Sequence, residues 1–360
     1  MRWEISDEQQ AFQETISAWL ARVAPVAAVK GWFEAGDTSS FDELLYSEGW
    51  IEVGVAEELG GQGGGLLELA LMAEEMGRAA VPSGDWLAAV LASPAIEGLA
   101  VGMPSWQRAE NRLALAIGAG GPPDAFRPAV VADDGTLTGE IPLVLGAEGA
   151  SALIVPATSS TGRALYLVDA SARGVDCRAR RLLDRSRPVA DLGLHDVAAR
   201  PLLLDVDSFL RDAARRAAVL VAADCLGATE RMLELAVEYS KQRQQFGVPI
   251  GSFQAMKHAA ASMLVAVESA RSIVYYAAAS VVEKNVDCAL HASIAKAQVT
   301  ATGSQLADSA LTMHGAIGYT WEHDLHRYYK RARFDEVLFG PPSVWNERIA
   351  LELLGRPRAS

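Results

Sequence analysis

The sequence has 360 residues, half of them hydrophobic, and this length predicts a large core and two or three structural units. Aromatic residues make up only 7% of the chain, and the abundant alanine and leucine are typical of a helix-rich globular enzyme. The formal net charge of −13, without a stripe of lysine and arginine, argues against nucleic-acid binding, because phosphate recognition needs a basic surface.

The N-terminal part of the chain predicts helices. Residues 1–4 include an acidic residue and no apolar signal-peptide core, so we expect a cytoplasmic protein. Ser6, followed by two acidic residues, marks the start of an amphipathic helix over 5–21. The glycine-rich stretch 60–65 is a loop, because it has the spacing of neither a dinucleotide fingerprint nor a P-loop. Further helices are predicted over 41–49, 66–78 and 83–98.

The sequence pattern changes near Arg112. The following segments are short and apolar, and clusters of Gly, Pro, Asp and Ser separate them. This spacing is typical of a small β-domain. Strands are predicted over 113–117, 129–132, 152–156, 164–168 and 189–192.

From about Asp205 the chain is again alanine-rich and helical. Long helices joined by short loops imply an antiparallel bundle. The one cationic cluster, at Lys330, Arg331 and Arg333, is predicted to be the solvated face of a helix. Helices are predicted over 208–240, 251–284, 288–314, 321–333 and 343–354. We expect an N-terminal helical domain over 1–111, a middle β-domain over 112–205 and a C-terminal four-helix-bundle domain over 206–360.

Cys177, Cys225 and Cys288 lie far apart in the sequence and form no CxxC pair. Their spacing predicts small buried thiols in a reducing compartment, with neither disulfides nor a zinc site. No uncharged apolar run reaches the roughly 18 residues of a membrane-spanning helix. We therefore expect no membrane contact and no metal.

The most specific segment is 239–254, which reads YSKQRQQFGVPIGSFQ. It resembles the YxxxRxxFGxPIxxFQ signature of acyl-CoA dehydrogenases and joins two long predicted helices, as in that family. The segment 313–320, MHGAIGYT, is similar to the family's QxHGGxGYT loop, and 49–78 is also similar. The resemblance covers nearly the whole chain. It implies the acyl-CoA dehydrogenase-like fold: an all-α N-terminal domain, a small middle β-domain and a C-terminal antiparallel helical bundle.

The resemblance also implies FAD as the cofactor. In the family the first segment reaches across a subunit interface to the ADP half of FAD, and this role falls to Arg243, Phe246 and Gln254. The Arg243 guanidinium is suited to it, because it can form a forked contact with a pyrophosphate. Without the resemblance, Arg243 would be interpreted as a surface or salt-bridged arginine.

The second loop departs from the family pattern at two positions. Gly315 would let the backbone approach a phosphate or ribose, but Ala316 replaces the second glycine and resists positive φ. Thr312 stands where the family has a glutamine. His314 is predicted to pack on its neighbours, and contact with a ligand is the alternative interpretation. Thr312, Gly315 and Ala316 complete the candidate cofactor-binding set.

The family reaction needs a carboxylate that removes the α-proton of an acyl-CoA while a hydride moves to the flavin. Counting from the second loop places Phe339 at the usual position of that glutamate. The alternative position, early in the long helix before the signature, is occupied by Ala217, with Ala218 beside it. None of these side chains can accept a proton. The resemblance therefore implies a chain without a catalytic base.

The flavin-facing part of the β-domain has also changed. Residues 117–124 read IGAGGPPD and lack the hydroxyl groups of the family's TEPxxGSD-like segment. The later flavin-facing strand, which normally carries an aromatic residue and a threonine, reads LVLG over 143–146. The chain thus keeps the motif that reaches a neighbour's FAD and lacks its own flavin-facing groups.

Three hypotheses follow. The favoured one is the non-catalytic subunit of a heteromer, because the chain resembles actinobacterial acyl-CoA dehydrogenases built from two different chains, several of which act on bulky, steroid-derived acyl-CoAs. It implies an acyl-CoA substrate, a second acyl-CoA dehydrogenase-type chain in a heterotetramer, and electron-transfer flavoprotein as acceptor. The second is a self-sufficient dehydrogenase with a relocated carboxylate. The third is a binding or regulatory protein without redox chemistry.

The relocated carboxylate has four candidates, each with a simpler structural explanation. Glu322 and Asp324 are predicted to begin a helix, where a carboxylate meets the helix dipole favourably. Asp335 and Glu336 precede Phe339 and are predicted to lie at a solvated helix end.

Overall fold

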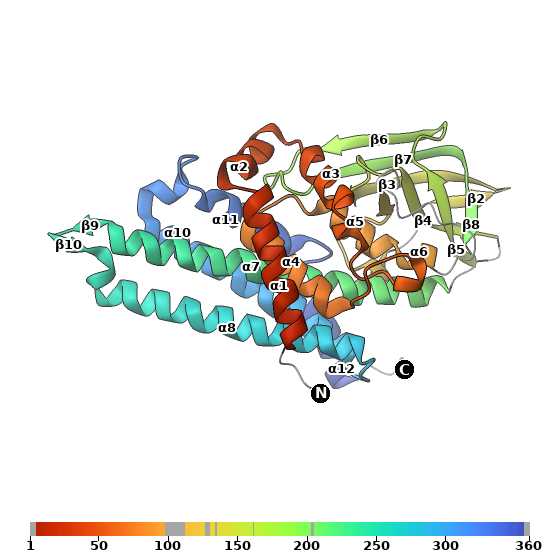
Figure 1. The fold of residues 1–360 in the computed structure, drawn as a ribbon. Coiled ribbons are helices and arrows are strands. Elements are labelled where there is room, and N and C mark those ends of the chain that lie inside the picture. The colour runs from red at the N-terminus through yellow and green to blue at the C-terminus, as the bar shows by residue number, and fades with distance from the viewer. Residues whose placement is uncertain are drawn as a thin grey trace. The chain divides into compact units, whose positions relative to one another are not determined.

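The computed structural model describes residues 5–97, 112–126, 130–133, 135–160, 162–202 and 205–355. Helices come first in the chain, a β-sheet follows, and long helices complete it, in the order that the sequence predicts (Figure 1). Contacts divide the chain into two compact units, one of Met1–Val26, Ala70–Val81 and Ala218–Ser360 and the other of Ala27–Leu69 and Pro82–Ala217. Each unit combines segments that are distant in sequence. The three-domain division above stays a prediction.

The first unit is built from helices. Its longest members are α7 and α8, which run side by side in opposite directions (Figure 1). A π-helical turn, Ala295–Val299, joins α9 to α10 without a break, and the short 3-10 turn Gly315–Tyr319 follows α10. The helices are α1 Asp7–Val23, α4 Leu66–Ala79, α7 Val206–Gln242, α8 Gln254–Val282, α9 Cys288–Ile294, α10 Thr300–His314, α11 Leu325–Val337 and α12 Pro342–Leu354.

Glycines allow these helices to pack closely. A Cβ at Gly227 on α7 would lie 1.8 Å from the Glu74 carbonyl oxygen of α4, and a Cβ at Gly77 would lie 2.0 Å from the Asp224 carbonyl oxygen. At α10, a Cβ on Gly303 would lie 2.3 Å from the Cys225 sulfur. Because these distances are far below van der Waals contact, the helix backbones of α4 and α7 touch at their crossing.

The second unit is built around an eight-stranded mixed sheet. The strand order is β6-β7-β3-β2-β4-β5-β8, with β1 paired to β4 in parallel. The strands are β1 Leu113–Leu115, β2 Val131–Asp133, β3 Thr136–Leu145, β4 Ala152–Ser159, β5 Gly162–Asp169, β6 Val175–Arg180, β7 Val189–Ala198 and β8 Arg200–Leu202. Its helical segments are α2 Val26–Ala35, α3 Ser39–Ser47, α5 Gly84–Ala92 and α6 Pro94–Glu97, with 3-10 turns at Trp50–Glu52, Glu57–Leu59 and Pro123–Ala125.

Most predicted elements are confirmed, and the differences have local causes. Ser6 caps α1 as predicted: its hydroxyl accepts from the Gln9 backbone, and the Gln9 side chain accepts from the Ser6 backbone. The predicted helix over 83–98 is interrupted before Pro94, because proline lacks the N–H that would continue it. Residue 98 lies outside the described residues. The predictions missed α2, β3, β6 and β8, of which β6 is exposed along nearly its whole length and gives no alternating pattern.

The exposure of the cationic cluster and of the cysteines differs from the prediction. Arg331 is fully buried, and its Nε and Nη2 donate to Asp224 at 2.8 and 2.6 Å while Nη1 donates to the Val81 carbonyl at 2.6 Å. The cationic cluster is therefore not uniformly solvated, because one of its guanidinium groups is an internal ion-pair partner. The three cysteines are free as predicted, but only Cys225 is buried, and Cys177 is exposed on β6.

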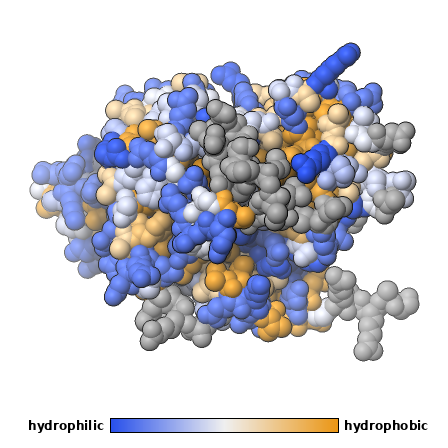
Figure 2. Space-filling model, turned by 45° about the vertical axis from the view of Figure 1, so that its right-hand side comes forward, coloured by the Kyte–Doolittle hydropathy of each residue, from blue (hydrophilic) through white to orange (hydrophobic). Residues whose placement is uncertain are grey.

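The face in Figure 2 is mostly hydrophilic, with hydrophobic areas separated by hydrophilic side chains. None of the helices described has both the length and the apolar character that a bilayer crossing requires. The described residues also contain no cluster of three or more side chains suited to a metal ion.

Candidate functional site

A strained hairpin joins α7 to α8. Strands β9, Gln244–Gln245, and β10, Val248–Pro249, pair antiparallel and project beyond the neighbouring helix ends (Figure 1). Two consecutive residues with positive φ close the hairpin, Phe246 at 55° and Gly247 at 80°. Such a turn is favoured for glycine and asparagine, so an aromatic residue there costs about 1–3 kcal/mol.

The hairpin exposes an aromatic ring that has little packing of its own. Phe246 is 93% exposed, and the ring contact recorded for it is with the edge of Phe253, 6.1 Å away between centroids. The Phe246 ring is therefore held in strained backbone and presented to solvent, an arrangement that packing within the described chain does not explain.

Arg243 and Gln254 lie at the two ends of the same hairpin. The Arg243 backbone is fixed, because its N–H donates to Tyr239 and its carbonyl accepts from Ile250, both at 2.8 Å. Both side chains are exposed, and among the described residues neither makes a hydrogen bond or an ion pair. The hairpin therefore presents a guanidinium, an amide and an aromatic ring together.

The second predicted cofactor segment lies at the end of α10. Gly315 ends this helix with φ of 65°, and a Cβ there would meet nothing within 4 Å, so the glycine is needed for its backbone conformation. Ala316 follows in a 3-10 turn without positive φ, which alanine accommodates. The Thr312 hydroxyl donates to the Asp308 carbonyl at 2.8 Å, and its side chain is exposed.

His314 connects the two segments. It is only 3% exposed and stacks on Tyr239, with 4.8 Å between ring centroids and 23° between planes. The prediction that His314 packs on its neighbours is therefore confirmed. Tyr239 opens the first segment and His314 lies in the second, so this stack brings the predicted cofactor segments together within the first unit.

A buried phenyl ring stands where the resemblance places the catalytic base. Phe339 is 2% exposed and lies with Gly340 in the turn between α11 and α12, at φ values of 55° and 102°. The Trp345 indole donates to the Phe339 carbonyl at 3.0 Å. The Lys296 ammonium donates to the carbonyls of Gly340 at 2.9 Å and Glu336 at 3.2 Å. The turn is thus firmly held, but it presents no proton acceptor.

Lys296 is a residue that the sequence reasoning missed. It is fully buried in the π-helical turn, and burial lowers its pKa to about 8, against the attraction of Asp335. The signal in the sequence is that Lys296 is the one Lys, Arg, Asp or Glu between positions 288 and 307. A single cation in an apolar helical stretch indicates a buried partner.

The structure places the four alternative carboxylates in different surroundings. Asp335 is fully buried near Lys296, so the predicted solvated helix end is wrong for it. Glu336 accepts from the Ser304 hydroxyl at 2.6 Å. Asp324 accepts from Arg327 at 2.8 Å, and Glu322 is exposed ahead of α11, which begins at Leu325 and not at the predicted 321.

At the alternative position for the base, Ala217 and Ala218 are both fully buried in α7. A methyl side chain offers no proton acceptor, so the structure places no carboxylate at either predicted position.

In the second unit, the two predicted flavin-facing segments lie side by side. The Ala119 N–H donates to the Leu143 carbonyl at 2.9 Å, and Gly118 bridges Val144. Leu143 has φ of 55° and is 37% exposed, and its N–H donates to Asp191 at 3.1 Å. The segments meet as a flavin-facing surface would require, but their exposed side chain is aliphatic and cannot hydrogen-bond a flavin ring.

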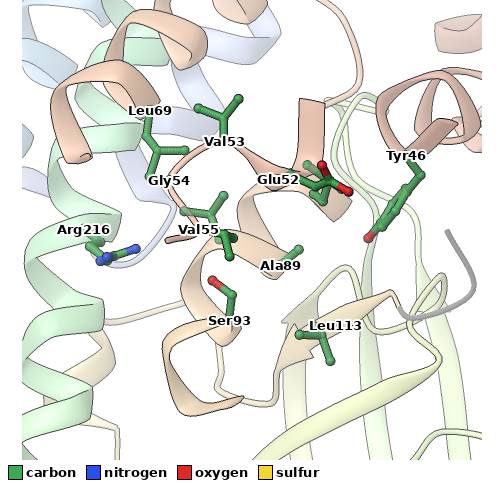
Figure 3. Close-up of a pocket in the computed structure, with 12 residues that line it drawn as sticks. Tyr46, Glu52, Val53, Gly54, Val55, Leu69, Ala89, Ser93, Leu113 and Arg216 are labelled. Atoms are coloured by element: carbon green, nitrogen blue, oxygen red, sulfur yellow. The ribbon is translucent and has the colours of Figure 1, made fainter. Parts of the chain in front are cut away.

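The second unit also contains a small pocket between α5, α7, β1 and the 50–55 segment. Figure 3 shows the Tyr46 hydroxyl and the Glu52 carboxylate on one side and the Arg216 guanidinium on the other. The space open to the centres of water-sized molecules is only about 30 Å³. This volume holds about one or two waters and is too small for an acyl chain. The sequence reasoning did not single out these lining residues.

Behind Tyr46 lies a buried acidic pair. Asp42 is 1% exposed and Asp85 is 6% exposed, and Arg112 approaches Asp85 at 3.8 Å. Burial, together with the repulsion of Asp85, raises the pKa of Asp42 to about 8. Burial also raises the pKa of Asp85, although Arg112 opposes this. At neutral pH Asp42 therefore keeps its proton.

Comparisons with known proteins agree with this architecture. Residues 6–100 match the model of the acyl-CoA dehydrogenase N-terminal domain, and residues 211–354 match that of the C-terminal domain. The acyl-CoA dehydrogenase IpdE2 of Mycobacterium tuberculosis is 35% identical over 98% of this chain and 99% of its own length. A solved variant of the Tcur3481-Tcur3483 steroid ACAD has a TM-score of 0.83 at 26% identity, covering 98% of this chain and 99% of that one. The ChsE4-ChsE5 complex from Mycobacterium tuberculosis has a TM-score of 0.82 at 25% identity, covering 99% and 100%.

Proposed function

Because this chain belongs to the acyl-CoA dehydrogenase family, we propose that it is the non-catalytic chain of an FAD-dependent dehydrogenase made of two different chains. The reaction is the α,β-desaturation of an acyl-CoA thioester, and the partner chain supplies the base. One observation carries this proposal: a buried phenyl ring, Phe339, stands in an intact turn where the family places its glutamate.

The residues present fit one half of an FAD site. The exposed Arg243 guanidinium and Gln254 amide suit the diphosphate and adenosine side, and the strained Phe246 ring suits contact with a neighbouring chain. The 117–124 and 143–146 segments suit the flavin ring less well, because they lack the hydroxyl and aromatic side chains of the family's flavin-facing segments. When bound, FAD accepts the hydride that leaves the acyl group. This chain's own residues hold the far end of the cofactor and remove no proton.

The proposed partner is a second acyl-CoA dehydrogenase-type chain, in a heterotetramer. A surface for it is the outward face of α8, where Leu264 is 50% exposed, Val265 66% and Tyr276 38%. Exposed apolar side chains along a 29-residue helix are typical of a protein–protein contact. Two of the similar structures are named as pairs of different proteins, Tcur3481-Tcur3483 and ChsE4-ChsE5.

We propose a bulky, steroid-derived acyl-CoA as the substrate and electron-transfer flavoprotein as the electron acceptor. The substrate class is supported by one similar solved protein, the Tcur3481-Tcur3483 variant, which is a steroid ACAD.

The experiment is to purify the complex of this chain and its partner with Arg243→Ala and to compare its flavin absorbance with that of the native complex. We expect the variant complex to assemble and to lose most of its flavin, because the guanidinium holds the diphosphate. Arg211→Ala is the matched control, since Arg211 is an exposed arginine on α7, the helix that ends one residue before Arg243. Unchanged flavin content in Arg243→Ala would remove the cofactor role from this hairpin.

A further inference from the structure

We propose that Tyr239, His314 and His323 form a clasp that positions the 315–319 loop and stays closed only while both imidazoles are neutral. The clasp is inferred from ring contacts and hydrogen bonds alone. Only the contact of the 315–319 loop with FAD rests on the proposed function. The clasp joins the end of α7, the end of α10 and the segment before α11.

The three rings are in direct contact. His314 is stacked on Tyr239 at 4.8 Å, and the His323 ring meets His314 at 4.5 Å with 61° between the planes. His323 also meets Tyr239 edge-on, at 6.3 Å and 82°. Such offset and edge-to-face arrangements are favourable for uncharged rings.

The loop rests on this clasp. A Cβ at Gly318 would lie 3.0 Å from the His314 Cβ, so the loop backbone passes directly over that histidine. The loop has little other support, since its hydrogen bonds are local and Tyr319 is 71% exposed. Because His323 follows the loop and His314 precedes it, the two imidazoles hold both of its ends.

The hydrogen bonds assign a neutral form to His323. Its Nδ1 accepts from the backbone N–H of Leu325, the first residue of α11, at 3.2 Å. An N–H group can only donate, so Nδ1 carries no hydrogen in this arrangement. Protonation would place a hydrogen on Nδ1 against that donor and break the contact that joins the loop to α11.

His314 is constrained on its other side. Its Nδ1 lies 2.7 Å from the Ala310 carbonyl, which can only accept, so Nδ1 carries the hydrogen of the neutral ring. A second proton would create a charge in a buried site, within 4.5 Å of another imidazole. The two rings cannot both become charged without separating.

The surrounding groups favour the neutral rings overall. Burial lowers the pKa of His314 and the nearby His323 lowers it further, while the carbonyls of Ala310 and Leu235 oppose both effects. Burial likewise lowers the pKa of His323, and the Asp324 carboxylate opposes it. The clasp is therefore closed at neutral pH and opens as the pH falls below the ordinary histidine range.

Hydrogen exchange of the full-length chain tests the clasp without any flavin. Peptides that cover 311–324 are followed at pH 7.5 and pH 5.5, with correction for the intrinsic effect of pH on exchange. We expect the loop to open several-fold more often at pH 5.5 than at pH 7.5, because the open loop can bind a proton at His323 that the closed clasp excludes. A native loop with equal protection at both pH values would overturn the inference.

Two variants give the matched comparison. His323→Phe keeps a ring for the edge contact and removes the titration of this position, leaving only His314 to titrate, so we expect its loop to depend less on pH than the native loop. His258→Phe replaces an exposed histidine on α8 and should behave as the native chain. An undiminished pH effect in His323→Phe would also overturn the clasp. If the complex proves to hold no flavin but the exchange follows this pattern, the proposed function fails and the clasp stands.

Discussion

Among single residues, the most informative are buried side chains of a chemical type that differs from the one expected at their position. Phe339 lies in a turn that three hydrogen bonds hold at its carbonyl and those of Gly340 and Glu336, although the ring itself has no polar task. This turn therefore presents a phenyl ring at the position where the resemblance places the family's catalytic acid. The proposed function depends on this difference.

Restoring a carboxylate at this position is not expected to restore activity. Phe339→Glu gives the chain an acid in the family position, but the 117–124 and 143–146 segments still lack groups for a flavin ring. We expect no acyl-CoA-dependent reduction of an artificial electron acceptor by this variant alone, and a lower melting temperature than for Phe339→Leu, because a carboxylate is buried. Measurable turnover by Phe339→Glu alone would contradict the account.

Asp42 makes the stability of the second unit depend on pH. Its pKa is raised from 3.8 to about 8 on folding, so the folded state binds a proton more tightly than the unfolded state between these values. The free energy of unfolding therefore falls as the pH rises from about 4 to about 8. Asp42→Asn removes this titration, and we expect a flatter dependence of the urea midpoint on pH.

Urea unfolding at pH 5 and pH 8 measures this difference, with Glu8→Gln as an exposed control. If the urea midpoints of the native chain and Asp42→Asn change equally between the two pH values, Asp42 does not keep a proton in the folded chain.

Among the elements, close helix crossings require a small residue where two backbones touch and a paired charge where a polar side chain is buried. Gly227 brings α7 onto α4, and Asp224, one turn earlier on α7, receives the buried Arg331 of α11. A glycine and an ion pair thus fix the same region of the bundle. Neither contact could be predicted from the sequence, because each joins residues that are far apart in the chain.

The close crossing predicts a large effect for one methyl group. Gly227→Ala places a Cβ 1.8 Å from a backbone oxygen, so we expect a loss of about 2–3 kcal/mol in the free energy of unfolding. Gly31→Ala is the control: a Cβ there meets nothing within 4 Å, and replacing a glycine inside a helix stabilises by up to about 1 kcal/mol. Equal effects of the two substitutions would refute the proposed contact of the backbones.

The ion pair is tested by comparing a buried arginine with an exposed one. Arg331→Ala leaves Asp224 buried without its cation, and we expect a loss of about 3–5 kcal/mol in denaturant unfolding. Arg333→Ala removes an exposed pair with Asp308 and should cost less than about 1 kcal/mol. A small effect of Arg331→Ala would mean that the bundle tolerates the unpaired Asp224.

Local patterns predicted the elements well, and contacts between distant segments were not predictable. The Ser6 cap and the five apolar strands follow from signals within a few residues. The burial of Arg331 depends on Asp224, 107 positions earlier, so the sequence alone indicated a solvated helix face. The positive φ of Phe246 and Phe339 arises from turns that sequence motifs locate but do not describe.

Across the whole molecule, the chain keeps the family's helices and sheet. It matches the family's cofactor motifs in some segments and departs from them in others. The hairpin at 243–254 has exposed donors and an exposed ring, whereas the paired segments near Ala119 and Leu143 offer aliphatic groups. Under the proposed function, another chain completes the FAD site. We therefore expect flavin binding to be a property of the assembly.

The most direct measurement is the flavin absorbance of this chain purified alone and purified together with its partner. The account predicts a colourless chain alone and a yellow complex, with turnover of acyl-CoA only in the complex. A chain that is yellow and turns over acyl-CoA by itself would contradict it, and would show that a carboxylate elsewhere in this sequence serves as the base.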